Sequence, residues 1–153
     1  MRDYFIAMHN VVRQAVKYGL IPGQPEARHM NLLKWNTELA KKAQNFSDQC
    51  QLGHDKDEER KIPGFEYVGQ NWALTPRLLI GFKMWFDESQ NYNYNTNTCI
   101  NNQCTHYTQL IWENTTDFGC GVTECKNMLP NLNVICNYGP GGNILGVKPY
   151  RTA

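Results

Sequence analysis

Six cysteines are the feature that most limits what this chain can fold into. An even number, four of them at short spacings between residues 99 and 125, is typical of a disulfide framework. Zinc is the alternative, but Cys99-x4-Cys104 and Cys120-x4-Cys125 lack the nearby His or Cys ligands of a finger. Because disulfides persist in oxidising compartments, we expect a secreted, extracellular protein.

The pairing of the cysteines stays open at this point, because six cysteines allow 15 connectivities. Cys99 and Cys104 bracket four residues and could close a small loop. Cys120 and Cys136 could be cross-strand neighbours, which would leave Cys50 and Cys125 to join a helix to a sheet.

Charge and length exclude several other classes of protein. The net charge is +1 over 153 residues, and no Lys/Arg run exceeds two, so nothing indicates nucleic-acid binding. No apolar run is long enough for a transmembrane segment. The first residues, Met1 to Tyr4, lack the apolar core of a signal peptide. We therefore expect one mature domain over residues 1–153.

Apolar periodicity predicts three helices. Residues 3–18 carry apolar side chains at three- and four-residue spacing, and so do residues 37–50, where Asn36 or Thr37 can cap the first amides. A third helix is predicted to begin at Thr75-Pro76, with the threonine as its N-cap. The charged residues 55–61 indicate a solvated turn or short helix.

Three short segments are predicted to be strands, at residues 67–72, 122–125 and 134–138. The last two are joined by a turn at Pro130-Asn131. Residues 91–102, rich in Asn, Tyr and Thr, are expected to form a loop. Helices flanking a small antiparallel sheet give an α+β fold.

Two dense motifs indicate a known family. Cys104-Thr-His-Tyr-Thr-Gln-Leu-Ile-Trp112 and Ile135-Cys-Asn-Tyr-Gly-Pro-Gly-Gly-Asn143 resemble the paired signature segments of the CAP superfamily of cysteine-rich secretory, antigen 5 and pathogenesis-related-1 proteins. The resemblance, of the venom-allergen-like type, runs from His9 to Gly146. It implies a three-layer α-β-α sandwich stapled by disulfides, and it favours the pairing Cys50–Cys125, Cys99–Cys104 and Cys120–Cys136.

The family has a cleft lined by two histidines and two glutamates. His54 and His106 match the histidines, and Glu88 matches one glutamate in Trp85-Phe-Asp-Glu88. At the fourth position this chain has Gln70, in Gly69-Gln-Asn-Trp72, and an amide cannot act as a base. The resemblance thus implies a zinc or other divalent-metal site at His54 and His106, with no cofactor required and no catalytic residue. His9 and His29 are interpreted as structural.

Two sets of apolar residues suggest lipid binding. Several family members bind sterols at an aromatic loop, which Phe86, Tyr92 and Tyr94 match loosely, on a polar segment expected to expose its tyrosines. Some invertebrate members hold a fatty acid between two helices. The matching stripes here would form a fatty-acid groove from Phe5, Met8, Val12, Leu79 and Phe82.

The function predicted from the sequence is therefore a secreted, non-catalytic carrier of sterols or fatty acids. The sequons at Asn45 and Asn114 suggest glycosylation. A metal-dependent hydrolase using the cleft is the first alternative. An immune-modulating ligand that acts through its surface on a host-protein receptor is the second.

Overall fold

A four-stranded sheet forms the centre of the computed structural model, which describes all residues 1–153. Its order is β1 (Lys34–Trp35), β5 (Asp117–Glu124), β6 (Leu132–Gly139) and β2 (Gly69–Thr75). β5, β6 and β2 pair antiparallel, as predicted, and the two-residue β1 adds a parallel edge.

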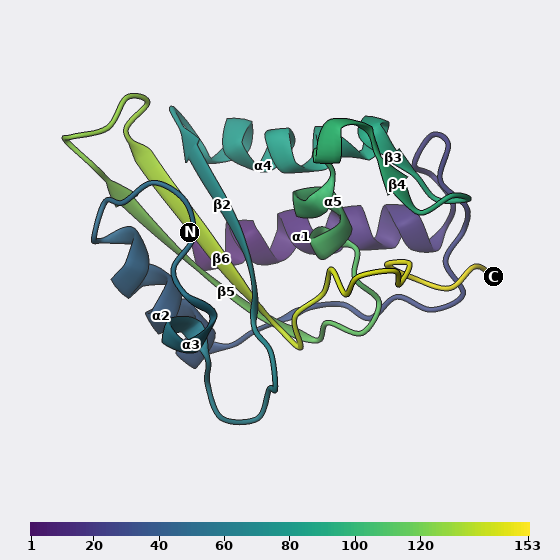
Figure 1. Cartoon of the computed structure of the whole chain (residues 1–153), viewed down its shortest axis with the longest axis horizontal. Helices are drawn as coiled ribbons and strands as arrows, with labels where there is room; N and C mark the ends of the chain where they lie inside the picture. Colours follow the sequence, from purple (N-terminus) through teal and green to yellow (C-terminus); the bar gives the residue numbers. More distant parts are fainter.

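Helices cover both faces of this sheet (Figure 1). α2 (Thr37–Ser47), with the one-turn α3 (Asp57–Arg60) beside it, packs on β5 and β6. On the other face lie α1 (Arg2–Lys17), α4 (Leu78–Asp87) and the short α5 (Thr105–Leu110). The three-layer α-β-α arrangement expected from the sequence is confirmed.

Two glycines let α2 approach the sheet closely. Gly119 and Gly121 alternate along β5 and so face the same side. A Cβ atom at either position would collide with the backbone of α2 at Ala40 or Gln44. The local sequence of β5 therefore sets the depth at which the helix packs.

The main core lies between the sheet and α1, α4 and α5. α1 contributes Phe5, Val12 and Val16, each at most 6 % exposed. It also buries His9 and Arg13 completely, which the apolar pattern did not identify as core. None of the helices is both long and apolar enough to span a bilayer.

Helix ends differ from the predictions where long-range pairing intervenes. α2 is capped by Asn36, whose Oδ1 accepts from the Glu38 and Leu39 amides. The helix ends at Ser47, and Cys50, predicted as its last residue, lies beyond it with a positive φ of 51°. The helix predicted from Thr75 begins at Leu78 instead. Thr75 is the last residue of β2 and pairs with Leu132, so it adopts a strand conformation.

The segment expected to be a loop at residues 91–102 has regular structure. It follows the 3-10 turn η1 (Glu88–Asn91) and contains a small hairpin of β3 (Tyr92–Asn93) and β4 (Thr98–Cys99), then the turn η2 (Ile100–Asn102).

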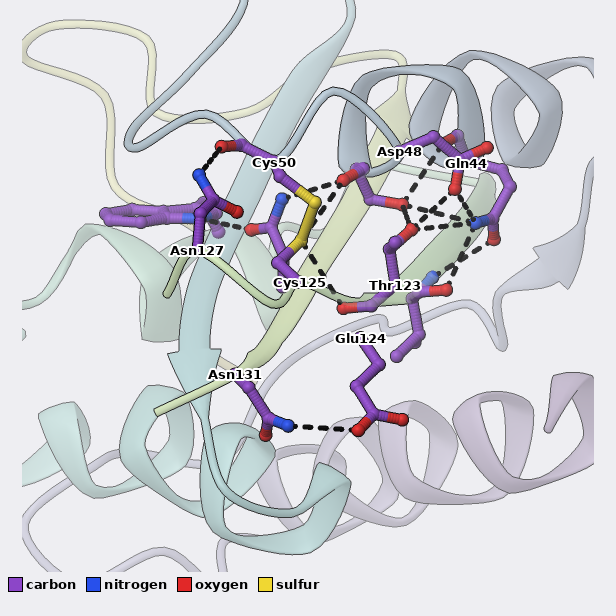
Figure 2. The surroundings of a disulfide bond; sticks show 12 residues. Gln44, Asp48, Cys50, Thr123, Glu124, Cys125, Asn127 and Asn131 are labelled. Atoms are coloured by element: carbon purple, nitrogen blue, oxygen red, sulfur yellow. Dashed lines mark hydrogen bonds between the residues drawn. A yellow bond between two sulfur atoms is a disulfide. The ribbon is translucent and has the colours of Figure 1, made fainter. Parts of the chain in front are cut away.

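The three disulfides confirm the pairing that the family resemblance favoured: Cys50–Cys125, Cys99–Cys104 and Cys120–Cys136. Figure 2 shows the first, which joins the end of α2 to the end of β5. Beside it, Gln44 Nε2 donates to Asp48 and Thr123, and Thr123 Oγ1 donates to Asp48 at 2.6 Å. Polar contacts thus reinforce the covalent staple.

Candidate functional site

His106 and Glu88 form the most tightly connected pair in the site. His106 Nδ1 donates to Glu88 Oε2 at 2.7 Å. The other carboxylate oxygen accepts from the backbone amides of His106 and Tyr107, at 2.9 and 3.2 Å. Glu88, at the end of α4, thus caps the first amides of α5, where a negative charge is stabilising. The Trp85 ring stacks on the imidazole with an interplanar angle of 10°.

His54 forms a second pair with Gln70. Gln70 Nε2 donates to Asp55 and Asn137, at 3.1 and 2.9 Å, which turns its Oε1 toward His54. His54 Nδ1 donates to that oxygen at 2.8 Å. Burial raises the pKa of Asp55, although the Arg60 guanidinium opposes the shift.

The two pairs come from different layers and meet at the edge strand β2. Gln70 faces the side of the sheet where Asn137 Nδ2 reaches the α2 carbonyl of Leu39. Its neighbour Asn71 faces the other side, where its Nδ2 donates to the His106 carbonyl at 3.1 Å. No hydrogen bond joins the pairs directly, so Asn71 is the link between them. The sequence analysis did not identify Asn71 as a site residue, although it stands next to Gln70.

The second signature segment holds the first in place. Asn143 Oδ1 accepts from Thr108 at 2.6 Å, and its Nδ2 donates to the Thr105 carbonyl. Gly142 donates to Gln109, and a Cβ atom at Gly142 would collide with the Trp112 ring. The two motifs are therefore adjacent parts of one structure that supports α5.

Both imidazoles present the same atom to a ligand. Each Nδ1 is a donor in the pairs above, so each Nε2 carries the free lone pair. Such second contacts are usual for metal-binding histidines. Glu88, in contrast, has both oxygens engaged and acts as an orienting group rather than a third ligand. No group of three His, Cys, Asp or Glu side chains is placed to hold a metal ion.

A polar pocket of about 490 Å³ opens beside the His106–Glu88 pair. Eight residues line it, of which only Met84 is hydrophobic: Met84, Asp87, Glu88, Asn91, Asn102, Gln103, Thr105 and His106. His54 and Gln70 lie outside this lining. The structure thus divides the four cleft positions into two pairs, of which only His106 and Glu88 line the polar pocket.

An apolar groove of about 290 Å³ runs between α1 and α4. Four of the five residues predicted for a fatty-acid groove line it, and Phe5 does not, because it is only 1 % exposed and lies in the core beneath. Five lining residues were not predicted for the groove, and one of them, Ile21, lies outside both helices, in the loop after α1. The full lining is Met8, Val11, Val12, Ala15, Ile21, Leu79, Phe82, Lys83 and Phe86.

The expectation that the polar loop exposes its tyrosines is wrong. Tyr92 and Tyr94 are each 6 % exposed and belong to the main core. Tyr92 donates its hydroxyl proton to Asn97, and Tyr94 donates to the Tyr150 carbonyl at 2.6 Å. Tyr150 of the C-terminal segment therefore packs against the Tyr94 ring, which a sterol would need. The side chain of Phe86 faces the α1–α4 groove instead.

The remaining predicted residues are the two sequon asparagines and the two histidines outside the cleft. Asn45 is exposed in the last turn of α2, and Asn114 is exposed between α5 and β5. His29 is exposed and contacts Asn31. His9 is fully buried, with Nδ1 donating to the Phe5 carbonyl and Nε2 accepting from a tyrosine hydroxyl.

Arg13 is the largest buried group that the sequence analysis missed. Its guanidinium donates to four backbone carbonyls, of Asn31, Leu110, Trp112 and Thr115. Burial lowers its pKa to about 9, which leaves it charged at neutral pH. The spacing could have indicated this burial, because Arg13 lies four residues after His9 and therefore on the same side of α1.

Comparisons with known proteins agree with this geometry. The chain is 40 % identical to venom allergen 5 of Dolichovespula arenaria over 98 % of this chain and 80 % of that protein. Its fold matches the solved structure of Schistosoma mansoni venom allergen-like protein 4, with a TM-score of 0.91 and 35 % identity, covering 99 % and 94 % of the two chains. It also matches a structure described as NaASP2 with Zn2+, with a TM-score of 0.83 and 27 % identity, over 99 % and 85 %.

A family model described as "Cysteine-rich secretory protein family" matches residues 6–138, which include the cleft pairs, most of α1 and all of α4. The chain therefore belongs to the cysteine-rich secretory protein (CAP) family, as a venom-allergen-like member.

Proposed function

We propose that the protein is a secreted carrier that binds a fatty acid in the groove between α1 and α4 and catalyses no reaction. The observation that carries this proposal is the lining of the groove, in which eight of nine residues are hydrophobic. Val11 and Leu79 on its rim are 66 % and 55 % exposed. Without a ligand, these apolar side chains face water, which is unfavourable.

The size and charge of the groove favour a fatty acid over a sterol. Its volume of about 290 Å³ lies at the lower limit of small-molecule sites, roughly 300–1,000 Å³. A flexible acyl chain can place a segment in such a space, whereas a rigid four-ring sterol cannot bend to it. Lys83, the one charged residue in the lining, pairs with Asp87 at 2.6 Å, and its ammonium has two further donors that a fatty-acid carboxylate can use.

Palmitate titration followed by native mass spectrometry tests the proposal. Leu79→Glu places a carboxylate in the groove and should weaken palmitate binding about tenfold or more, which is 1.4 kcal/mol. Leu145→Glu is the matched control, because Leu145 is 99 % exposed on the C-terminal segment. Equal palmitate binding by both variants would contradict a site in this groove.

We further propose that His54 and His106 bind a divalent cation such as zinc. The observation in favour is the pair of free Nε2 atoms, each fixed by a partner at Nδ1. The related NaASP2 was solved with zinc. With only two protein ligands, the site would be completed by water and would bind weakly. Gln70, an amide, offers no base beside it, which supports binding rather than catalysis.

Zinc titration by calorimetry separates these roles. Gln70→Glu should tighten zinc binding about tenfold, because a carboxylate partner makes the imidazole a better ligand. His106→Ala should weaken binding, and His29→Ala should not. Zinc-dependent cleavage of a peptide library that is lost in His106→Ala would instead establish the hydrolase.

A further inference from the structure

A second pocket, which shares only Asn91 with the lining of the polar pocket beside His106, is built largely from amide side chains. It has a volume of about 370 Å³ and lies over the β3–β4 hairpin. Its lining carries no charged residue. We name it the amide pocket and define it by its ten residues: Gly23, Gln90, Asn91, Tyr92, Asn93, Tyr94, Asn95, Thr98, Cys99 and Ile100.

Several amide groups in this pocket have no partner within the protein. The side chains of Gln90 and Asn95 are exposed and make no hydrogen bond to other residues. Asn91 uses only its Nδ2, on the Gln103 carbonyl, and Asn93 uses only its Oδ1, which accepts from the Thr96 amide. Donors and acceptors thus both remain free around one small space.

The floor of the pocket is rigid. Tyr92 and Tyr94 lie edge to face at 90°, and each hydroxyl is tied to the protein. Gln24 Nε2 donates to the Tyr92 carbonyl at 3.1 Å, and the Cys99–Cys104 disulfide joins the end of β4 to the residue before α5. A preformed site loses little conformational entropy when it binds.

We propose that the amide pocket binds a neutral saccharide. Each sugar hydroxyl both donates and accepts, and a side-chain amide presents one acceptor and two donors, so the two groups complement each other. The exposed Ile100 offers an apolar wall for the C–H face of a sugar ring.

Charge decides against other ligand classes. Lys148 lies over the ring of the lining residue Tyr94, at 4.6 Å from its centroid, but is not itself part of the lining. An anionic or sulfated ligand would therefore find no counter-charge in the pocket. A sterol has one hydroxyl and would leave most of the amides desolvated and unpaired.

Saturation-transfer NMR with the methyl glycosides of glucose, galactose, mannose and N-acetylglucosamine tests the proposal. At least one should give a signal at millimolar concentration, and a sulfated disaccharide should give none. Asn93→Asp keeps the oxygen that caps Thr96 but loses the free donor, so it should weaken binding about fivefold, the effect of one hydrogen bond. Asn114→Asp, at an exposed asparagine elsewhere, should leave binding unchanged.

Three results would overturn the proposal. These are no signal from any neutral glycoside, equal binding of the sulfated disaccharide, or a signal that Asn93→Asp does not weaken. The palmitate and zinc experiments use other residues, so their outcomes are independent of this one.

Discussion

The buried imidazole of His9 should make the fold sensitive to mild acid. His9 is completely buried against aromatic rings, among them Phe82 and Phe118. Its Nε2, the only site for a second proton, already accepts from the Tyr138 hydroxyl at 2.7 Å. The charged Arg13 guanidinium also opposes a second positive charge. Burial is the largest cause, and the pKa of His9 falls from 6.5 to about 3.

The sign and size of the effect follow from linkage. Because the native pKa lies below that of the unfolded chain, the unfolded state binds more protons as pH drops from 6.5 toward 3. The stability contributed by neutral His9 is complete above pH 6.5 and is lost progressively below it. Between pH 7.5 and 5.5 the loss is about 1.4 kcal/mol.

Urea unfolding at the two pH values measures this loss. His9→Gln should lower the free energy of unfolding at pH 7.5, since contacts are removed, but its further loss on going to pH 5.5 should be about 1.4 kcal/mol smaller than that of the parent protein. His29→Gln, at an exposed histidine, should leave the pH dependence unchanged. The reasoning is refuted if His9→Gln and the parent protein lose the same amount.

Three further predictions concern stability and are checked by urea unfolding. Arg13→Met should lower the free energy of unfolding by about 3–5 kcal/mol, because four buried carbonyls lose their donor. Arg2→Met, at an exposed arginine, should leave that free energy nearly unchanged. A loss below about 1 kcal/mol for Arg13→Met would contradict the role given to its four hydrogen bonds. Replacing Cys50 and Cys125 by serine should lower the free energy of unfolding by about 4.5 kcal/mol, because the unfolded chain is no longer restricted by a loop of 75 residues. An unchanged urea midpoint would contradict this expectation. Asn36→Ala should lose about 1 kcal/mol as the α2 cap is removed, and no loss would show that the cap is dispensable.

Local sequence patterns predicted helices and strands well where residues close in sequence determine the conformation. The 3.6-residue periodicity places α1 within a residue of its observed ends, because one continuous stripe faces the core. The run of strand-forming residues at 134–138 located the centre of β6, although pairing extends the strand to Leu132–Gly139. Thr75 shows the limit: its Thr-Pro signal fits a helix start, but a ladder partner in β6 decides its conformation.

Burial was harder to predict where chain segments distant in sequence decide it. Asn-rich surroundings indicated exposure for Tyr94, yet its hydroxyl donates to the carbonyl of Tyr150, 56 residues later. The four carbonyls that accept from Arg13 likewise belong to residues 18 to 102 positions further along the chain. Periodicity contains no information about such partners, because it describes one element at a time.

Motifs and spacings within single segments were enough to indicate the family and the α+β class. The four cleft positions and the disulfide pairing were predicted only through the resemblance to that family. Only the tertiary structure showed that His106 pairs with Glu88 and His54 with Gln70, and that Glu88 serves as the cap of α5 rather than as a free metal ligand. The physical reason is that a carboxylate's role depends on which donors surround it, and here those donors are backbone amides brought close only when α4 and α5 pack together.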